Sequence, residues 1–452
     1  MGLYCSDYQR VAFLIYFLMA ILRQIKTVLG QLPSYAVPCC LLHGALFFSP
    51  AVHAASLSEA VHQGLAIHPG VRAAMADVER AETEVDVSKG GYFPSLDVKG
   101  GPSTASSDPL TYNVTVSQMV YDWGRVESKV DSASATMRKQ TENLLVVREN
   151  TALEISETYL DVLGASLRIQ AVEEYLQRLQ QLRELTGSRQ TGGYSDGSET
   201  ARTELALGKA KEQLAMEKGK LRDAEAQYRI QVGQEPANLV LPPFEPWEKL
   251  MPTDEMVLDD MIAQSPLYRK ASEDVAVAEA GLQGAKAALL PQLKVEGMAM
   301  RRPIGGEMRS DEIASLNFSM DPIQGLSNFK RADAEAQRVQ AAQGSLDNTL
   351  RDSKRKLRSW IETGEALKWR LEAFEGQLAK AAEVRALYQE QFQVGKRSIV
   401  DLLSVENESF EAQRQRVSAI TEWERLQYRA VAQIGQLVPL LEGRLAAESK
   451  PQ

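Results

Sequence analysis

The sequence predicts a mainly α-helical chain with a small β part, built from two copies of one unit. Three observations predict this fold. Distant segments match each other, long proline-free stretches carry a seven-residue apolar period, and short stretches alternate apolar with polar residues. Each copy is therefore expected to contain short helices, two strands and a long helical hairpin, in that order.

The internal repeat is visible as matches at a fixed offset. Pro69 aligns with Pro266, 197 residues later, and a further proline and a glycine follow at the same offset. Further along, Gly193 aligns with Gly395 at an offset of 202. Matches spread over this length indicate a duplicated structural unit.

The duplication and the proline positions set the expected boundaries. The chain divides into a signal peptide (1–54), a first repeat (55–235), a proline-rich connector (236–255), a second repeat (256–438) and a C-terminal tail (439–452). Within the repeats we expect strands over 92–101, 112–121, 291–300 and 313–321, and helical hairpins over 124–233 and 325–436.

The long hairpins are predicted from heptads. Ile155, Val162, Ile169 and Leu176 recur every seven residues, and the second copy carries similar series. A strict seven-residue period is typical of helices that supercoil against neighbours. The helix from Gly124 to Thr186 alone would be about 95 Å long, so an elongated helical structure is expected.

The predicted strands each have one apolar and one polar face. They read SLDVKG, YNVTVSQMV, QLKVEGMA and ASLNFSMD, and the stretches GPSTASSDPLT and RRPIGGEMRSDE are expected to be polar loops between them. Aromatic residues lie near the strand ends, namely Tyr92, Phe93, Tyr112, Tyr121 and Trp123. This pattern suits a soluble sheet or the wall of a membrane barrel with an aromatic girdle.

Closure of the sheet limits the membrane interpretation. Four strands are too few to enclose a lumen, and lipid does not tolerate open sheet edges. Strands that enter a membrane therefore require several chains to share one barrel, with two, three or four chains supplying eight, twelve or sixteen strands. Because side chains fill the interior of an eight-stranded barrel, a passage favours three chains or more.

The N-terminus is expected to be an export signal. A short apolar block, 36–48, follows basic residues and precedes small residues that permit cleavage after Ala54. Either Met1 or Met19 can be the start, and a buried helix is the alternative interpretation. No run of 18 apolar residues is present, so no membrane-spanning helix is expected.

The composition excludes several classes of function. The net charge of -9 argues against a nucleic-acid-binding protein. Removal of the leader would leave no cysteine and only His62 and His68, so disulfides, thiol catalysis and cysteine metal sites are not expected. The sequence also shows no phosphate loop and no nucleophile–base set, so neither enzymatic activity nor a cofactor is predicted.

The duplication, the strands FPSLDVKG and LPQLKVEG, the helix entry MVYDWGR and the segment QFQVGKRSIVDLLSVENE together resemble the TolC-like outer membrane factors. The resemblance covers nearly all of residues 56–440. It implies a homotrimer whose twelve-stranded outer membrane β-barrel is continued by a long periplasmic α-helical barrel. It also implies outer membrane lipid, a periplasmic adaptor (membrane fusion) protein and an inner membrane ABC transporter as partners, without nucleic acid.

The resemblance places a periplasmic entrance at two hairpin tips, GGYSDGSE and VGKRSIVD. The implied gate and pore-constriction residues are Arg397, Asp401, Ser404, Phe392, Ser198 and Glu199. The implied adaptor contacts are Gly193, Tyr194, Ser195, Gly395, Lys396 and Ser398.

Two gate positions depart from the family pattern. Ser404 replaces a pore-facing aspartate of some members, and Phe392 replaces an aromatic hydroxyl that often makes a gating hydrogen bond. The closed state is therefore expected to be held through Arg397 and Glu199. Without the family, Arg397 and Asp401 read as a solvated pair in which the aspartate caps a helix, a role compatible with lining the entrance.

The predicted function is that of a passive exit duct in a tripartite export system. A ring of three Asp401 carboxylates would favour cations, and contact with partners would untwist the tips. The first cargo expectation is type I secretion of a protein substrate through an ABC transporter, and the alternative is drug efflux by a proton-driven pump. A soluble periplasmic coiled-coil scaffold is an alternative from another class, but it leaves the alternating strands unexplained.

Overall fold

The computed structural model describes residues 56–102, 110–241, 254–304, 307–320 and 327–448. The expected signal peptide, 1–54, and most of the proline-rich connector lie outside these residues. The first repeat contains α2 (Leu57–Ile67), α3 (Pro69–Lys89), η1 (Gly90–Tyr92), β1 (Ser95–Pro102), β2 (Leu110–Tyr121), α4 (Arg125–Thr191) and α5 (Ser198–Val232). The second contains α7 (Glu255–Ala263), α8 (Pro266–Ala287), β3 (Gln292–Ile304), β4 (Glu307–Ser319), α9 (Ser327–Gln393) and α10 (Ile399–Gln433), and α11 (Leu437–Glu448) follows.

Equivalent helices of the two repeats have matching lengths. Helices α4 and α9 contain 67 residues each, α5 and α10 contain 35 each, and α3 and α8 contain 21 and 22. A helix of 67 residues is about 100 Å long. The predicted mainly α-helical fold with a small sheet and a duplicated unit is confirmed.

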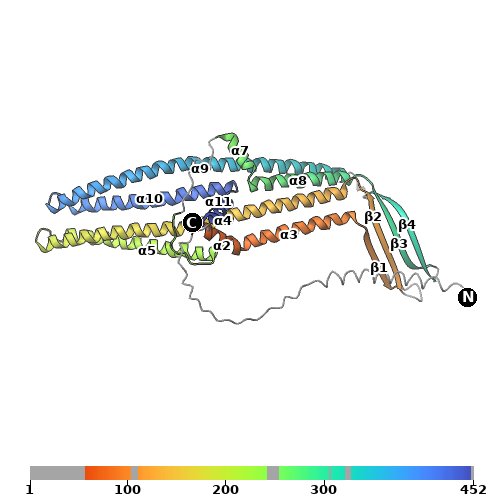
Figure 1. The fold of residues 1–452 in the computed structure, drawn as a ribbon, viewed down its shortest axis with the longest axis horizontal. Helices are drawn as coiled ribbons and strands as arrows, with labels where there is room; N and C mark the ends of the chain where they lie inside the picture. Colours follow the sequence, from red (N-terminus) through yellow and green to blue (C-terminus); the bar gives the residue numbers. More distant parts are fainter. Residues whose placement is uncertain (1–55, 103–109, 242–253, 305–306, 321–326, 449–452) are drawn as a thin grey trace. The chain divides into compact units, whose positions relative to one another are not determined.

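Helices α4 and α9 run the full length of the helical part, and shorter helices pack beside them (Figure 1). Helix α3 packs along the half of α4 that is next to the sheet, and α8 packs along the corresponding half of α9. Helices α5 and α10 pack along the other halves of α4 and α9, next to the hairpin turns. Helix α4 also packs against α8 and α10 of the second repeat. The two repeats therefore share one helical body.

Apolar side chains at the predicted heptad positions form the contacts between these helices. Ile155 and Val162 on α4 and Leu357 on α9 belong to one large buried cluster. Tyr159 is fully buried in the same cluster, and its hydroxyl both accepts a hydrogen bond from the Val240 amide (3.0 Å) and donates one to the Val240 carbonyl (2.8 Å). The two hydrogen bonds of this buried tyrosine thus hold the start of the connector against α4.

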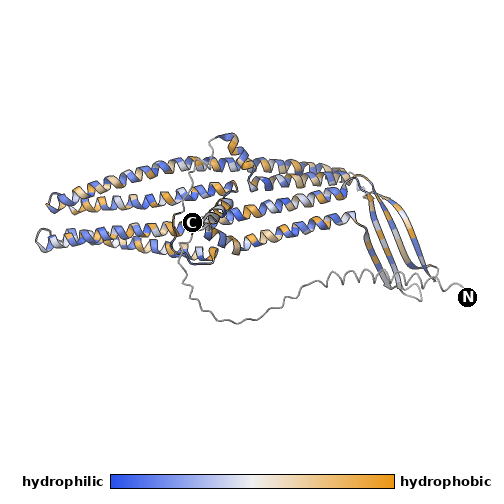
Figure 2. Ribbon diagram, in the orientation of Figure 1, coloured by the Kyte–Doolittle hydropathy of each residue, from blue (hydrophilic) through white to orange (hydrophobic). Residues whose placement is uncertain are grey.

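The four strands form one antiparallel sheet in the order β1-β2-β3-β4. Strand β2 of the first repeat pairs with β3 of the second, and β1 and β4 form the two edges. Cross-strand partners place apolar residues on one face, as in Leu96↔Val116 and Leu293↔Phe318. Figure 2 shows the resulting alternation of polar and apolar residues along the strands.

The described helices leave the apolar face of the sheet exposed. Leu96, Val98, Leu316 and Phe318 are between 65% and 73% exposed. These side chains stabilise the folded protein only when a lipid phase or another chain removes their apolar surface from water.

Strands β3 and β4 are longer than predicted. The stretch 301–312 was expected to be a loop, which is wrong, since 301–304 and 307–312 belong to the two strands. The ladder continues through Arg302↔Arg309, because backbone hydrogen bonds do not require apolar side chains when neither face is buried in a core. Strand β1 begins later than the predicted residue 92. It begins at Ser95, and 90–92 form a short 3₁₀ helix.

The segment DWG connects the sheet to α4. The Asp122 carboxylate accepts hydrogen bonds from the amides of Gly124 (3.1 Å) and Val126 (2.7 Å) and so satisfies the start of the helix. Trp123 adopts a φ of 59°, which is unfavourable for a bulky side chain. Its indole N–H donates to the Pro291 carbonyl at 2.8 Å, so this conformation also links the two repeats.

Glu149 on α4 holds the N-terminus of α11. The predicted C-terminal tail, 439–452, begins inside this helix. The Glu149 carboxylate accepts hydrogen bonds from the amides of Leu437 (3.0 Å) and Val438 (3.1 Å) and is almost completely buried. Burial raises the pKa of Glu149 to about 7, although the two amides and Arg148 favour its ionised form.

We expect Glu149→Gln to weaken the pH dependence of stability near neutrality. Because the folded-state pKa, about 7, lies above the ordinary 4.5, the folded chain binds this proton more tightly than the unfolded chain. The contribution of Glu149 to the free energy of unfolding therefore falls as pH rises from 4.5 through 7, by roughly 3 kcal/mol. Thermal unfolding in detergent at pH 5 and pH 8 measures this loss, which should be smaller in the variant.

The matched control is Glu154→Gln, which changes an exposed glutamate of the same helix and should keep the wild-type pH dependence. An equal loss of stability between pH 5 and pH 8 in wild type and Glu149→Gln would contradict the assignment.

Candidate functional site

The two helical hairpins turn at the end of the helical body that lies opposite the sheet (Figure 1). Each turn contains a glycine in the left-handed conformation, Gly193 with φ 77° and Gly395 with φ 74°. The amide after each glycine donates back to the helix, from Tyr194 to the Arg189 carbonyl at 2.9 Å and equivalently from Lys396 at 2.8 Å. These helix ends explain the glycine match between the repeats, since only glycine takes this conformation without strain.

The return helices begin differently in the two hairpins. In α10, the Ser398 hydroxyl accepts from the Asp401 amide (3.3 Å), and the Asp401 carboxylate accepts from the Ser398 amide (3.2 Å). This capping box gives Asp401 the helix-capping role expected from its sequence position. In α5, Asp196 accepts from the Ser198 amide (3.0 Å), and hydrogen bonds from Ser198 lower the pKa of Asp196.

Among the described residues, the ring contact, hydrogen bond and ion pair of Arg397 all stay within its own hairpin. Its guanidinium lies 4.3 Å from the centre of the Tyr388 ring and donates to Gln391 at 3.0 Å. Its nearest approach to the Asp401 carboxylate is 4.0 Å, and both side chains are about 40% exposed. An ion pair of this kind contributes little to stability.

Arg189 on α4 is a tip residue that the sequence analysis missed. Its Nε lies 3.2 Å from the Glu199 carboxylate of α5, and its Nη1 donates to the Phe392 carbonyl of α9 at 3.1 Å. The guanidinium also stacks over the Phe392 ring, 4.6 Å from its centre. One side chain therefore joins three helices and both hairpins.

The predicted gate residues do not all face an opening. Phe392 is fully buried, so its ring packs in the apolar core of the tip, and Glu199 is engaged by Arg189. Ser404 is exposed and donates to Glu408 at 3.0 Å. Within the described part of the chain, no hydrogen bond or ion pair joins Arg397 to Glu199. The expectation that these two residues hold the closed state together has no support from contacts within one chain.

The predicted adaptor-contact residues lie at the surface of the two turns. Tyr194 is 79% exposed, and only Ser195 is partly buried. The exposed members are Gly193, Tyr194, Gly395, Lys396 and Ser398. The turns therefore offer polar side chains and one large aromatic ring to a partner.

Above the tip, a buried glutamate connects the two hairpins. Glu406 on α10 is fully buried, and its two carboxylate oxygens each lie 2.9 Å from a guanidinium, Arg178 on α4 and Arg385 on α9. The ring of Tyr175 stacks on Phe410 beside it, with centres 4.5 Å apart. Burial raises the pKa of Tyr175 to about 12, so this hydroxyl stays neutral.

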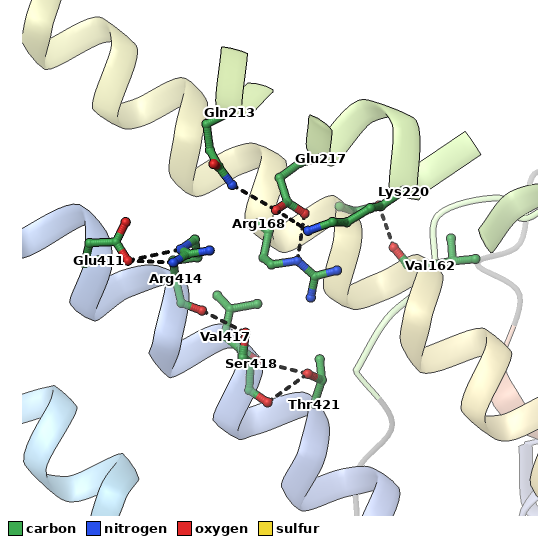
Figure 3. Close-up of polar contacts among 11 residues, drawn as sticks. Val162, Arg168, Gln213, Glu217, Lys220, Glu411, Arg414, Val417, Ser418 and Thr421 are labelled. Atoms are coloured by element: carbon green, nitrogen blue, oxygen red, sulfur yellow. Dashed lines mark hydrogen bonds and ion pairs between the residues drawn. The ribbon is translucent and has the colours of Figure 1, made fainter. Parts of the chain in front are cut away.

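A second buried carboxylate joins the helices of the first hairpin, as Figure 3 shows. Glu217 on α5 is fully buried and receives Arg168 of α4 (2.9 Å), Lys220 (2.9 Å) and Gln213 (3.1 Å). Burial opposes ionisation, but the hydrogen bonds of Lys220 and Arg168 outweigh it and lower the pKa of Glu217. The carboxylate is therefore a permanent ionic link between α4 and α5.

Comparison with known proteins identifies the family. The model of the outer membrane efflux protein family matches residues 60–233 and 257–435. The outer membrane efflux protein BepC of Brucella suis biovar 1 is 21% identical over 437 residues, which cover 94% of this chain and 95% of BepC. Among solved structures, the outer membrane protein VceC of Vibrio cholerae is 14% identical with a TM-score of 0.72, over 84% of this chain and 96% of VceC. The open state of the Neisseria gonorrhoeae outer membrane channel MtrE is 18% identical with a TM-score of 0.69, over 84% and 89% of the two chains.

The chain belongs to the outer membrane efflux protein family, and the two matched ranges coincide with its two repeats. The predicted membership of the TolC-like outer membrane factors is confirmed, as is the location in the outer membrane with an extension into the periplasm. The function is that of an outer membrane efflux channel, which replaces the alternative of a soluble scaffold. Among the described residues, no helix combines the length and apolarity needed to cross a membrane, and no group of three or more metal-ligating side chains occurs.

We expect Glu406→Gln to destabilise the protein strongly, because it removes the charge of a fully buried carboxylate that pairs with two partly buried guanidinium groups. The duplication supplies the matched control, since Glu204 occupies the equivalent position and pairs with Arg183 at 3.3 Å, with both side chains more than half exposed. We expect a loss of about 3 kcal/mol or more for Glu406→Gln. Glu204→Gln should cost less than about 1 kcal/mol.

Denaturant unfolding of the detergent-solubilised protein measures both losses. Similar destabilisation by the two substitutions would show that burial of Glu406 does not make its ion pairs structurally important.

Proposed function

We propose that this chain forms a homotrimeric exit duct of a tripartite export system, docked to a periplasmic adaptor protein and an inner membrane transporter. The observation that carries the proposal is the incomplete sheet, which has four strands, two edges and an apolar face that its own helices leave exposed. Three copies would supply twelve strands and remove every edge in lipid. The efflux channel function of the family supports this arrangement.

The size of the apolar face supports a membrane position. On β2, Tyr112 and Tyr121 lie at opposite ends of the apolar face. At the rise of a strand and a barrel tilt of 40°, the intervening chain spans about 23 Å along the membrane normal, which is close to the apolar band of outer membrane barrels. The opposite face, with Glu296 and Asn317, is polar and suits a water-filled lumen.

At the other end of the duct, we propose that Asp401 contributes to a ring of three carboxylates at the periplasmic entrance, with Arg397 beside it. The Asp401 side chain is 40% exposed, so a carboxylate oxygen is available to solvent while the capping box fixes its position. A fixed ring of negative charge in a narrow passage favours cations over anions. Contact of the exposed turns with an adaptor would bias the tips toward an open arrangement.

Two substitutions of Asp401 separate its charge from its capping role. Asp401→Asn retains an acceptor for the Ser398 amide but removes the charge, and Asp401→Ala removes both. In planar bilayers we expect both variants to lose most of the preference for cations and to show weaker block by trivalent cations. Only Asp401→Ala should lower the thermal midpoint. Wild-type selectivity and block in Asp401→Asn would remove Asp401 from the constriction.

Two classes of cargo fit the duct. Type I secretion of a protein substrate through an ABC transporter is the first, and efflux of drugs or other small molecules by a proton-driven pump is the second. The name of BepC, an efflux protein, supports the second class.

A deletion strain discriminates between the cargo classes. Loss of a secreted protein from the medium with unchanged drug susceptibility is the result expected for secretion. Increased susceptibility to drugs with unchanged secreted proteins is expected for efflux. Complementation with the wild-type chain and with a variant that lacks both hairpin turns distinguishes transport from an effect on the envelope.

A further inference from the structure

We infer that Arg189 is the positioning residue that holds the tip of the second hairpin against the first when the entrance is closed. This inference rests on the proposed function, in which the entrance opens by movement of the tips. Arg189 is the tip side chain that bonds to both hairpins: to Glu199 of α5 and to the carbonyl and ring of Phe392 on α9.

The contact at Phe392 is favourable for a cation. Phe392 is the penultimate residue of α9, and its carbonyl already accepts from the Gly395 amide at 3.0 Å. Carbonyl groups at a helix C-terminus carry partial negative charge, so a guanidinium donating there also compensates the helix dipole. Phe392 has no hydroxyl that could form a hydrogen bond to the first hairpin. The hydrogen bond between the hairpins at this position is donated instead by the Arg189 guanidinium of the first hairpin.

The Glu199 carboxylate orients the guanidinium for this contact. The Arg189 and Glu199 side chains are 19% and 20% exposed, so their ion pair is partly shielded from water. With Nε engaged by Glu199, Nη1 donates to the Phe392 carbonyl of α9, and the planar group covers the Phe392 ring. Ion pair, hydrogen bond and ring contact thus use one rigid group, which a lysine cannot reproduce.

The position of Arg189 relative to the Glu406 cluster suits a reversible contact. Arg178, which binds Glu406, precedes Arg189 by three helical turns, or about 16 Å. The Glu406 carboxylate is fully buried and its ion pairs are costly to break, whereas Arg189 can leave the Phe392 carbonyl and keep Glu199. The tip of the second hairpin, between Arg385 on α9 and Glu406 on α10, can therefore separate from the first hairpin. The ion pairs of Glu406 still hold the two hairpins together on the side toward the sheet.

The chain contains a matched control for Arg189. Arg183 lies on the same helix and forms the same type of ion pair across the first hairpin, with Glu204 at 3.3 Å. Among the described residues, no hydrogen bond or ion pair joins Arg183 to α9, so its loss should leave the two hairpins joined. Arg183→Ala removes an arginine and a hairpin ion pair, as Arg189→Ala does, without removing the proposed connection.

The experiment compares single-channel conductance in planar bilayers of the full-length protein and its variants. We expect Arg189→Ala to raise the conductance severalfold, Arg189→Lys to give an intermediate value and Arg183→Ala to match wild type. Glu199→Gln should give a smaller increase in the same direction, which provides a reading if Arg189→Ala does not assemble. Wild-type conductance in Arg189→Lys and Glu199→Gln, or an equal increase in Arg183→Ala, would overturn the inference.

The cation selectivity of Asp401→Asn, measured in the same bilayers, separates the two failures. If Asp401→Asn changes the selectivity but the Arg189 variants conduct like wild type, the entrance lies at the tips and Arg189 does not keep it closed. If neither set of variants changes conductance or selectivity, the entrance lies elsewhere, and both the inference and the proposed gate are wrong.

Discussion

The need to satisfy backbone hydrogen bonds at a sheet edge constrains the rest of this structure. A sheet of four strands ends at β1 and β4, and in lipid each unpaired backbone group at those edges costs several kcal/mol. The apolar face, represented by Phe318, is also left exposed by the part of the chain that the structure describes. The chain thus carries one segment of a wall, and the long helices continue that segment away from the membrane.

The duplication produces two similar hairpins that have diverged in their surroundings. The pairs Arg183–Glu204 and Arg385–Glu406 occupy equivalent positions, yet both side chains of the first are more than half exposed, whereas Glu406 is fully buried and also pairs with Arg178. An exposed ion pair contributes little to stability, whereas a buried one becomes destabilising when either partner is lost. The same residue types therefore contribute differently to the free energy of unfolding. Helix α4 of the first hairpin packs against α10 and contacts Glu406, whereas Glu204 on α5 stays exposed.

The sequence predicted the elements of the fold but not the contacts that join them. Heptads such as Ile155 and Val162, the alternating strands and the offset glycines depend on local periods of 3.5 and 2, which a single sequence displays. The contact from Arg189 to Phe392 spans 203 residues, and that from Glu149 to Leu437 spans 288. Nothing in the local pattern distinguishes these charged residues from solvated ones on the same helices. The repeat gave one usable signal, since Arg183 and Arg385 share the 202-residue offset of Glu204 and Glu406.

The pairing of β2 with β3 has a consequence for the symmetry of the proposed ring. These strands come from different copies, so the junction inside one chain is of the same kind as the junction between β4 of one chain and β1 of the next in the proposed trimer. The ring is therefore sixfold in its architecture and threefold only in its sequence. A chain of half this length, with two strands and one hairpin, would therefore need six identical copies to close the same ring.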